Sequence, residues 1–129
     1  MQDFNPDTVR AGMKVPDNLR GAYDKIVKAG LKLMLDEKTM PATLRYLAGP
    51  DPVTEKLGKG TAGLMLYLFE RSNRTMPPQL VIPAGIELLS HGADLLRKAG
   101  QEVSIDDIAE AMADFIQLIL QKFDVKEKV

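Results

Sequence analysis

The string most suggestive of chemistry in this sequence is a glycine-rich run at residues 58–63. It fits the G-x-G-x-x-G pattern, in which glycines let a dinucleotide pyrophosphate approach the N-terminus of a helix. In this chain the run reads Gly58-Lys59-Gly60-Thr61-Ala62-Gly63. The pattern needs a β-strand directly before it, whereas residues 53–57 have a helical pattern. We therefore expect glycines that serve helix packing or a kink, and we assign no cofactor to the chain.

A second candidate group surrounds the single histidine of the chain. On a helix, His91 shares a face with Glu87 one turn before it and with Asp94 one turn after it. One imidazole and two carboxylates could contribute to a metal site or to acid–base catalysis, but the sequence has no Cys and no second His to complete a strong ligand set. We interpret these residues as a helix surface. We expect neither a metal site nor an enzyme.

Two rows of charged side chains are candidates for a protein–protein contact. One row is basic and the other is acidic, and each follows one face of an expected helix: Lys25, Lys28 and Lys32, and Asp106, Asp107, Glu110 and Asp114. Both rows could simply be solvated, since an exposed ion pair contributes only about 0–1 kcal/mol. The alternative is that the acidic row of one copy meets the basic row of the next. Such a heterologous contact fixes orientation and closes into a ring where the rotation allows.

The polar connector between the two most apolar segments is another candidate contact surface. It reads Asn73-Arg74-Thr75-Met76-Pro77-Pro78-Gln79. The prolines restrict the backbone. Arg71 and Arg74 could form bidentate hydrogen bonds with a partner, and Met76 beside them could add an apolar contact. The alternative interpretation is a plain turn between helices.

The elements that must position these residues are all helices. The chain has 129 residues, 45% hydrophobic and 27% charged, which is typical of one globular domain. Apolar residues recur at intervals of three and four, and the best strand candidate, Leu80-Val81-Ile82, is interrupted by Pro83. The sequence predicts an all-α fold: a compact bundle of four to five helices with an N-terminal extended arm. The expected parts are the arm 1–16, a helical domain 17–125, a frayed tail 126–129, helices at 17–37, 52–72, 83–99 and 104–123, and a short helix from Pro41 to Gly49.

Several packing details follow from the same patterns. Asp17 is a plausible cap for the first long helix, and Ser104 with Asp107 resembles a capping box for the last. The run 62–69 is apolar on every side, so we expect protein all around it. Gly85 and Gly92 lie seven residues apart on one face of the expected helix, where they could let the backbone of a neighbouring helix approach closely. The core-facing stripe of the last helix is expected to comprise Ile105, Ile108, Ala109, Met112, Ile116, Ile119, Leu120 and Phe123.

Net charge and hydropathy exclude some classes of function. The formal charge is -1, so no overall basic field exists to hold nucleic acid. No apolar run reaches the roughly 20 residues of a membrane span, and the first residues lack the pattern of a secretory signal. We therefore expect protein partners, and neither nucleic acid nor a membrane.

Three stretches together resemble small helical proteins encoded among the structural genes of tailed bacteriophages. They are residues 55–65 (EKLGKGTAGLM), 73–79 (NRTMPPQ) and 82–85 (IPAG). The resemblance covers the layout of about 17–125 and implies a multi-copy virion or assembly component, for example at the head–tail junction. Its partners would be copies of itself and other virion proteins, in the virion or in the host cytoplasm during assembly. The alternative is a small cytoplasmic regulatory or host-modulating binding protein that acts as a monomer or dimer.

Overall fold

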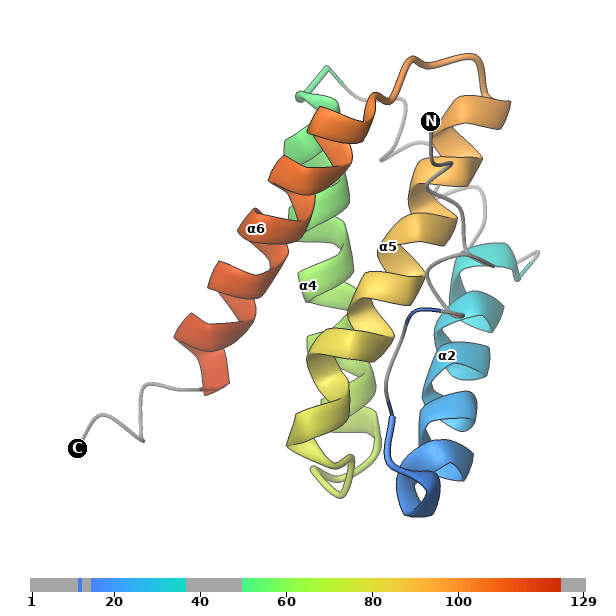
Figure 1. Cartoon of the computed structure of the whole chain (residues 1–129), viewed down its shortest axis with the longest axis vertical. Coiled ribbons are helices and arrows are strands. Elements are labelled where there is room, and N and C mark those ends of the chain that lie inside the picture. Colours follow the sequence, from blue (N-terminus) through green and yellow to red (C-terminus); the bar gives the residue numbers. More distant parts are fainter. Residues whose placement is uncertain (1–11, 13–14, 37–49, 124–129) are drawn as a thin grey trace.

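The computed structural model describes residue 12, residues 15–36 and residues 50–123 (Figure 1). Within these ranges the chain is helical and contains no strand, so the prediction of an all-α bundle is confirmed. The α-helices are α2 (Arg20–Leu35), α4 (Val53–Arg71), α5 (Val81–Lys98) and α6 (Ile105–Phe123), and short 3-10 helices η1 (Asp17–Leu19) and η2 (Pro78–Leu80) precede α2 and α5. The expected short helix from Pro41 to Gly49, most of the arm 1–16 and the tail 126–129 lie outside the described residues.

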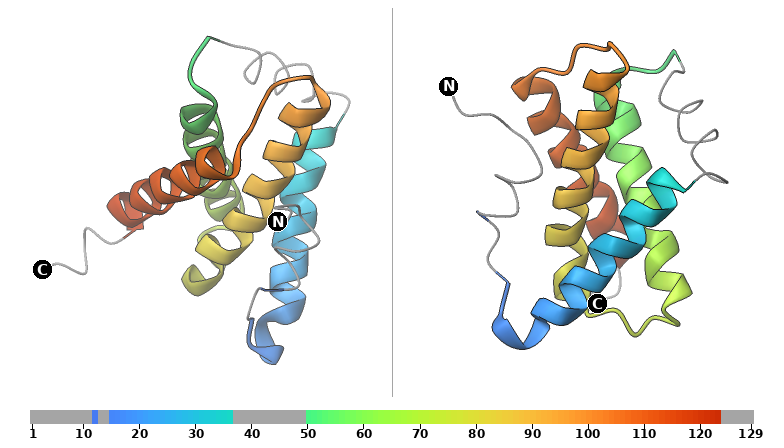
Figure 2. Two further views of the ribbon diagram at one scale, coloured as in Figure 1. Left: turned by 45° about the horizontal axis from the view of Figure 1, so that its top comes forward. Right: turned by 90° about the vertical axis from the view of Figure 1, so that its right-hand side faces the viewer.

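Helices α4 and α5 form the middle of the bundle. Each of them packs against the other and against both α2 and α6. Helices α2 and α6 lie on opposite sides of this pair, and the C-terminal half of α6 leans away from α5 (Figures 1 and 2). One face of α2 and one face of α6 are therefore not packed against the rest of the bundle.

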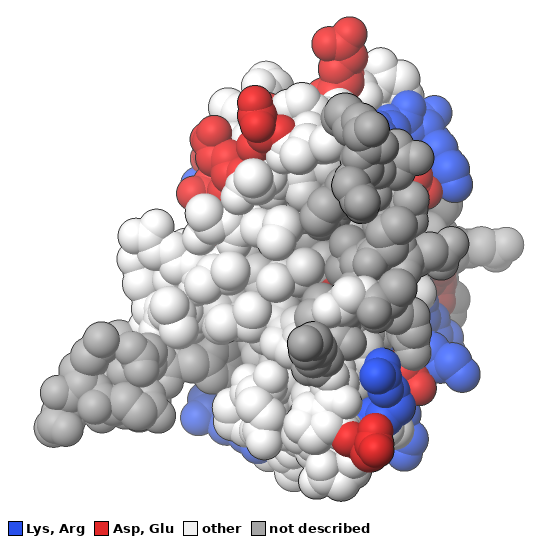
Figure 3. Space-filling model, viewed as in Figure 1, with Lys and Arg blue, Asp and Glu red and all other residues white. Residues whose placement is uncertain are grey.

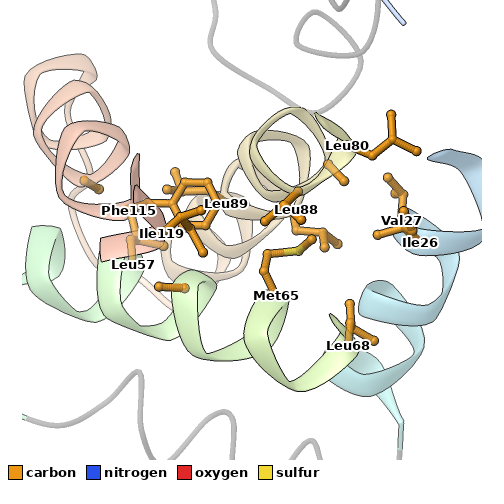
Figure 4. Close-up of a cluster of buried hydrophobic side chains, with 14 of the residues drawn as sticks. Ile26, Val27, Leu57, Met65, Leu68, Leu80, Leu88, Leu89, Phe115 and Ile119 are labelled. Atoms are coloured by element: carbon orange, nitrogen blue, oxygen red, sulfur yellow. The ribbon is translucent and has the colours of Figure 1, made fainter. Parts of the chain in front are cut away.

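The core fills the space between these four helices. Its largest fully buried side chains are those of Tyr23, Phe115, Met65, Leu80 and Leu88. Figure 4 shows leucine, methionine and phenylalanine side chains converging from α4, α5 and α6, and the isoleucine and valine side chains of α2 approaching them from the other side. Burial of this apolar surface, at about 25 cal/mol for each Å², is the main force that holds the helices together.

The ends of two helices follow the predicted chemistry. The Ser104 amide donates to Asp107 Oδ2, and the Asp107 amide donates to Ser104 Oγ, each at 3.0 Å. This reciprocal pair is the capping box that the sequence predicts. Helix α5 ends before Gly100, whose φ of 91° is in the left-handed region that favours glycine. The Gln101 amide then bonds back to the Leu96 carbonyl oxygen at 3.0 Å and closes the helix end.

The starts of α2 and α5 differ from the prediction. Asp17 lies inside η1, and α2 begins at Arg20 without a side-chain cap, so the prediction that Asp17 caps this helix is wrong. Helix α5 begins at Val81, two residues earlier than expected. Pro83 therefore occupies the first turn, where an amide hydrogen has no partner within the helix and its loss costs little.

Helix α4 is less enclosed than its composition suggests. Met65 is fully buried between the helices, but Tyr67 keeps 49% of its surface exposed and Gly63 is exposed as well. The expectation that protein surrounds residues 62–69 on every side is wrong. The outer side of α4 tolerates apolar residues because a Tyr side chain can pair an apolar body with a polar tip in water.

Helix α6 is rotated relative to the predicted stripe. The side chains that it buries are those of Ile108, Ala111, Phe115 and Ile119. Ala111 and Phe115 were absent from the predicted stripe, while two members of it, Ile105 and Leu120, are 39% and 47% exposed. The prediction that Ile108 and Ile119 are buried is confirmed, but the prediction of which side of α6 faces the core is wrong.

Glycines set the closest approaches between helices. A methyl group at Gly58 of α4 would lie 3.1 Å from the Ala111 carbonyl oxygen, so this glycine lets the backbones of α4 and α6 approach. A methyl group at Gly85 of α5 would overlap the ring of Phe115. At Gly92 the neighbour is the side chain of Leu57, at 3.1 Å. Gly85 and Gly92 of α5 thus make room for side chains of neighbouring helices. The sequence predicted that they would make room for a neighbouring backbone, and this prediction is wrong.

Replacement of Gly85 by alanine tests the ring contact with Phe115. We expect Gly85→Ala to lower the free energy of unfolding by about 1–3 kcal/mol, because the added methyl group overpacks a rigid, fully buried ring. The matched control is Gly63→Ala, since Gly63 has no neighbour within 4 Å and lies in a helix interior. The control should raise stability by up to about 1 kcal/mol. Urea denaturation measures both, and equal effects of the two substitutions would contradict the contact.

Candidate functional site

The glycine-rich run at residues 58–63 lies inside α4. The first helical hydrogen bond runs from the Lys56 amide to the Pro52 carbonyl oxygen at 3.0 Å, before the run begins. Amide groups in a helix interior bond to carbonyl groups one turn earlier, so they are not available to a phosphate. Gly58 also packs against α6, and Thr61 is buried. The run is a packing element in this structure and does not form a phosphate-binding turn.

The residues around the single histidine do not converge on one centre. Glu87 is 3% exposed, and its Oε1 accepts a hydrogen bond of 2.6 Å from the Tyr23 hydroxyl of α2. Asp94 lies at the surface and pairs with Lys98 at 3.1 Å. Half-buried His91 lies between them in sequence. Over residues 15–36 and 50–123, no group of three or more His, Asp or Glu side chains could hold a metal ion.

A buried cation was not singled out by the sequence. Lys56 is 3% exposed, and its ammonium group lies 3.5 Å from Gln101 Oε1 in the segment between α5 and α6. It lies on the side of α4 that also carries the buried Leu57. No pattern in the sequence distinguishes Lys56 from the exposed lysines, because its burial depends on where the loop after α5 passes.

The basic row of α2 is exposed along its whole length. Lys25, Lys28 and Lys32 are all exposed, and none of them forms an ion pair with another described residue. Their spacing of three and four residues places them on one face of the helix. The predicted basic row is therefore present as a continuous face, with its charges directed to solvent.

The acidic row of α6 borders an open groove between α4 and α6. Glu110 and Asp114 line it on the side of α6, and Glu55 with Lys59, an ion pair of 2.7 Å, lines it on the side of α4. Asp107 takes part in the capping box, where its carboxylate accepts a hydrogen bond from the Ser104 amide at the helix end. The groove has a volume of about 560 Å³. Its walls carry more negative than positive charge.

The two charged rows are not brought together within one chain. The basic row belongs to α2 and the acidic row to α6, and these helices lie on opposite sides of the bundle (Figure 1). Figure 3 shows acidic atoms at the upper left of the molecule and basic atoms mainly along its right side. An intramolecular contact between the rows is therefore excluded, whereas a contact between copies remains geometrically open.

The connector after α4 is a tight turn with an exposed arginine. Asn73 and Arg74 both have positive φ, 57° and 62°, which costs energy for residues other than glycine. Arg74 pairs with Glu70 at 2.9 Å, and the Arg71 guanidinium lies 5.7 Å from the centre of the Tyr67 ring. The turn thus presents two arginines and one aromatic ring at the end of α4.

Met76 does not belong to that exposed surface. It is only 6% exposed and is part of the core. Its amide donates to Ser72 Oγ at 3.1 Å, and this bond folds the connector back under α4. The prediction that Met76 offers an apolar contact to a partner is wrong, and only Arg71 and Arg74 of that group are accessible.

Replacement of Tyr23 tests whether the buried Glu87 needs its hydrogen bond. Tyr23→Phe removes the hydroxyl donor and leaves the carboxylate with one bond fewer in the core. We expect the free energy of unfolding to fall by about 1–3 kcal/mol in urea denaturation. Tyr67→Phe is the matched control, because Tyr67 is 49% exposed, and it should change stability by less than about 0.5 kcal/mol. If Tyr23→Phe leaves the free energy of unfolding unchanged, the hydrogen bond to Glu87 contributes little to stability.

No helix in the part of the chain that the structure describes combines the length and apolarity needed to cross a bilayer. Comparison of the chain with protein-family models, with curated proteins and with solved structures gives no match. The function proposed below therefore rests on the surfaces of the molecule and on the resemblance of the three stretches.

Proposed function

We propose that this chain is a non-enzymatic structural or assembly protein of a tailed bacteriophage particle, which acts in several copies through protein–protein contacts. The observation that supports the multi-copy part is the placement of the basic row and the acidic row on opposite sides of one bundle. The resemblance of three stretches to helical proteins from phage structural genes supports the part of the proposal that places the chain in a phage particle. The head–tail junction is one location in the particle that the resemblance implies.

The charges of the basic row favour a contact with another molecule. Lys25, Lys28 and Lys32 have no anionic partner among the described residues, and the acidic row has its own open groove. Because the two faces have opposite sign and point away from each other, one copy can offer lysines while the next offers carboxylates. A contact between different patches of identical chains is heterologous, and it forms a ring or a filament.

The contact would depend on electrostatics more than on buried apolar area. Each exposed pair contributes about 0–1 kcal/mol, so three pairs give orientation and faster association and only modest affinity. Salt screens such pairs, since the Debye length is about 8 Å at physiological ionic strength. Association through these rows should therefore weaken steeply as salt is added.

Charge reversal in the basic row tests this contact. We expect Lys28→Glu to weaken self-association at low salt by about tenfold or more, because the mutant places a carboxylate against carboxylates. The double variant Lys28→Glu with Glu110→Lys should restore part of the affinity. Lys98→Glu is the control, since Lys98 is exposed on α5, away from the basic row. Sedimentation velocity over a range of salt concentrations measures all four proteins.

The particle itself gives the second test. Mass spectrometry of purified particles and of assembly intermediates, from cells infected with the virus that encodes the chain, should detect its peptides at several copies for each particle. Absence from both preparations would contradict the proposal. If the protein also forms no assembly larger than a dimer at low salt, the two results together would favour a small cytoplasmic regulatory or host-modulating binding protein.

A further inference from the structure

A row of apolar side chains on α6 is only partly covered by the bundle. Ile105 is 39% exposed and Leu120 is 47% exposed, although both are large aliphatic residues. Between them along the helix, Ala109 and Ala113 are exposed, and Met112 and Ile116 are half-buried. We define the α6 stripe as Ile105, Ala109, Met112, Ala113, Ile116 and Leu120.

The α6 stripe is one continuous surface. At 3.6 residues for each turn its members follow the helix beside the buried row, over a length of about 22 Å. No member carries a charge. Asp107, Glu110 and Asp114 face away from the stripe, whereas Asp106 borders it beside Ala109. Figure 3 shows the same situation, with a face over α6 that is free of charged atoms below its acidic first turn. Contiguous exposed apolar surface of this kind indicates a contact site.

We propose that the α6 stripe binds the α6 stripe of a second copy, with the two helices antiparallel about a two-fold axis that passes between Met112 and Ala113. In that arrangement Ile105 of one copy lies opposite Leu120 of the other. Ile116 lies opposite Ala109, so a large side chain meets a small one. Met112 likewise lies opposite Ala113. The stripe is therefore complementary to its own reversed copy, as an isologous contact requires.

Charge also favours a second copy over another occupant of this stripe. A two-fold contact brings each patch against itself, so a charged patch would repel its copy. The acidic row of α6 fails this condition, and the α6 stripe meets it because it has no charge. The alanines at its centre allow two helix axes to approach to about 8 Å, the short end of the usual range for packed helices.

This contact is separate from the electrostatic contact of the proposed function. It uses neither the lysines of α2 nor the carboxylates of α6, and burial of apolar surface is insensitive to screening by salt. Self-association that survives at 1 M NaCl therefore reports the α6 stripe. Self-association that salt abolishes reports the charged rows.

The first experiment measures the mass of the full chain by sedimentation equilibrium at 1 M NaCl. We expect a dimer for the natural sequence, and a dissociation constant at least about a hundredfold larger for Leu120→Glu, which places two unpaired charges in one interface. The matched control is Gln121→Glu, which adds the same charge at the next, exposed residue outside the stripe. Circular dichroism should show that both variants keep their helices, because Leu120 contributes little to the core.

The second experiment tests the antiparallel geometry by cross-linking. The chain has no cysteine, so each single-cysteine variant reports one position. Ala113→Cys lies next to the two-fold axis and should form a covalent dimer with a short bismaleimide. Leu120→Cys should not, because its two copies would be separated by about 22 Å along the helices.

Three results would overturn the proposal. A monomer at 1 M NaCl at about 100 µM would mean that the stripe is covered by another part of the chain or serves another protein. A dimer unchanged by Leu120→Glu would place the contact elsewhere. Cross-linking of Leu120→Cys as well as Ala113→Cys would indicate parallel helices. None of these results bears on the charged rows, whose association is measured at low salt.

Discussion

The contact between the Phe115 ring and Gly85 determines how the last helix sits on the bundle. The ring is fully buried, and its neighbour on α5 has no side chain to displace it. A second contact acts on the same helix, since Gly58 of α4 lets the α6 backbone approach near Ala111. Two glycines on two helices thus hold α6 at two points. Together they fix its distance from the bundle and its rotation about its own axis.

The rotation of α6 has consequences for both of its surfaces. With Phe115 and Ala111 turned inward, Asp114 and Glu110 are carried to the groove beside α4. The same rotation leaves the α6 stripe outside the core. Rotation of α6 by one residue position toward the stripe would cover more of it, but this rotation would move the Phe115 ring away from Gly85. The protein thus exposes apolar surface on α6 as a result of its best internal packing.

The sequence predicts the elements of this fold well and their orientation poorly. Local chemistry reveals the capping box at Ser104 and the end of α5 at Gly100, because both depend on neighbouring residues in the chain. The orientation of α6 is different: its apolar residues cover more than half of the helix surface, so several rotations bury similar areas. The burial of Met76 and Lys56 likewise depends on the paths of loops, which no periodicity reveals.

The position of the two candidate surfaces on one helix limits how copies could be arranged. An isologous contact through the α6 stripe buries one side of α6. The acidic row stays accessible because most of it lies on the other side of this helix. The basic row on α2 lies across the bundle from both. A pair of copies joined by their stripes would therefore still present two acidic and two basic rows. When a two-fold contact is combined with a heterologous contact that closes into a ring, a closed assembly has dihedral or cubic symmetry and contains an even number of chains.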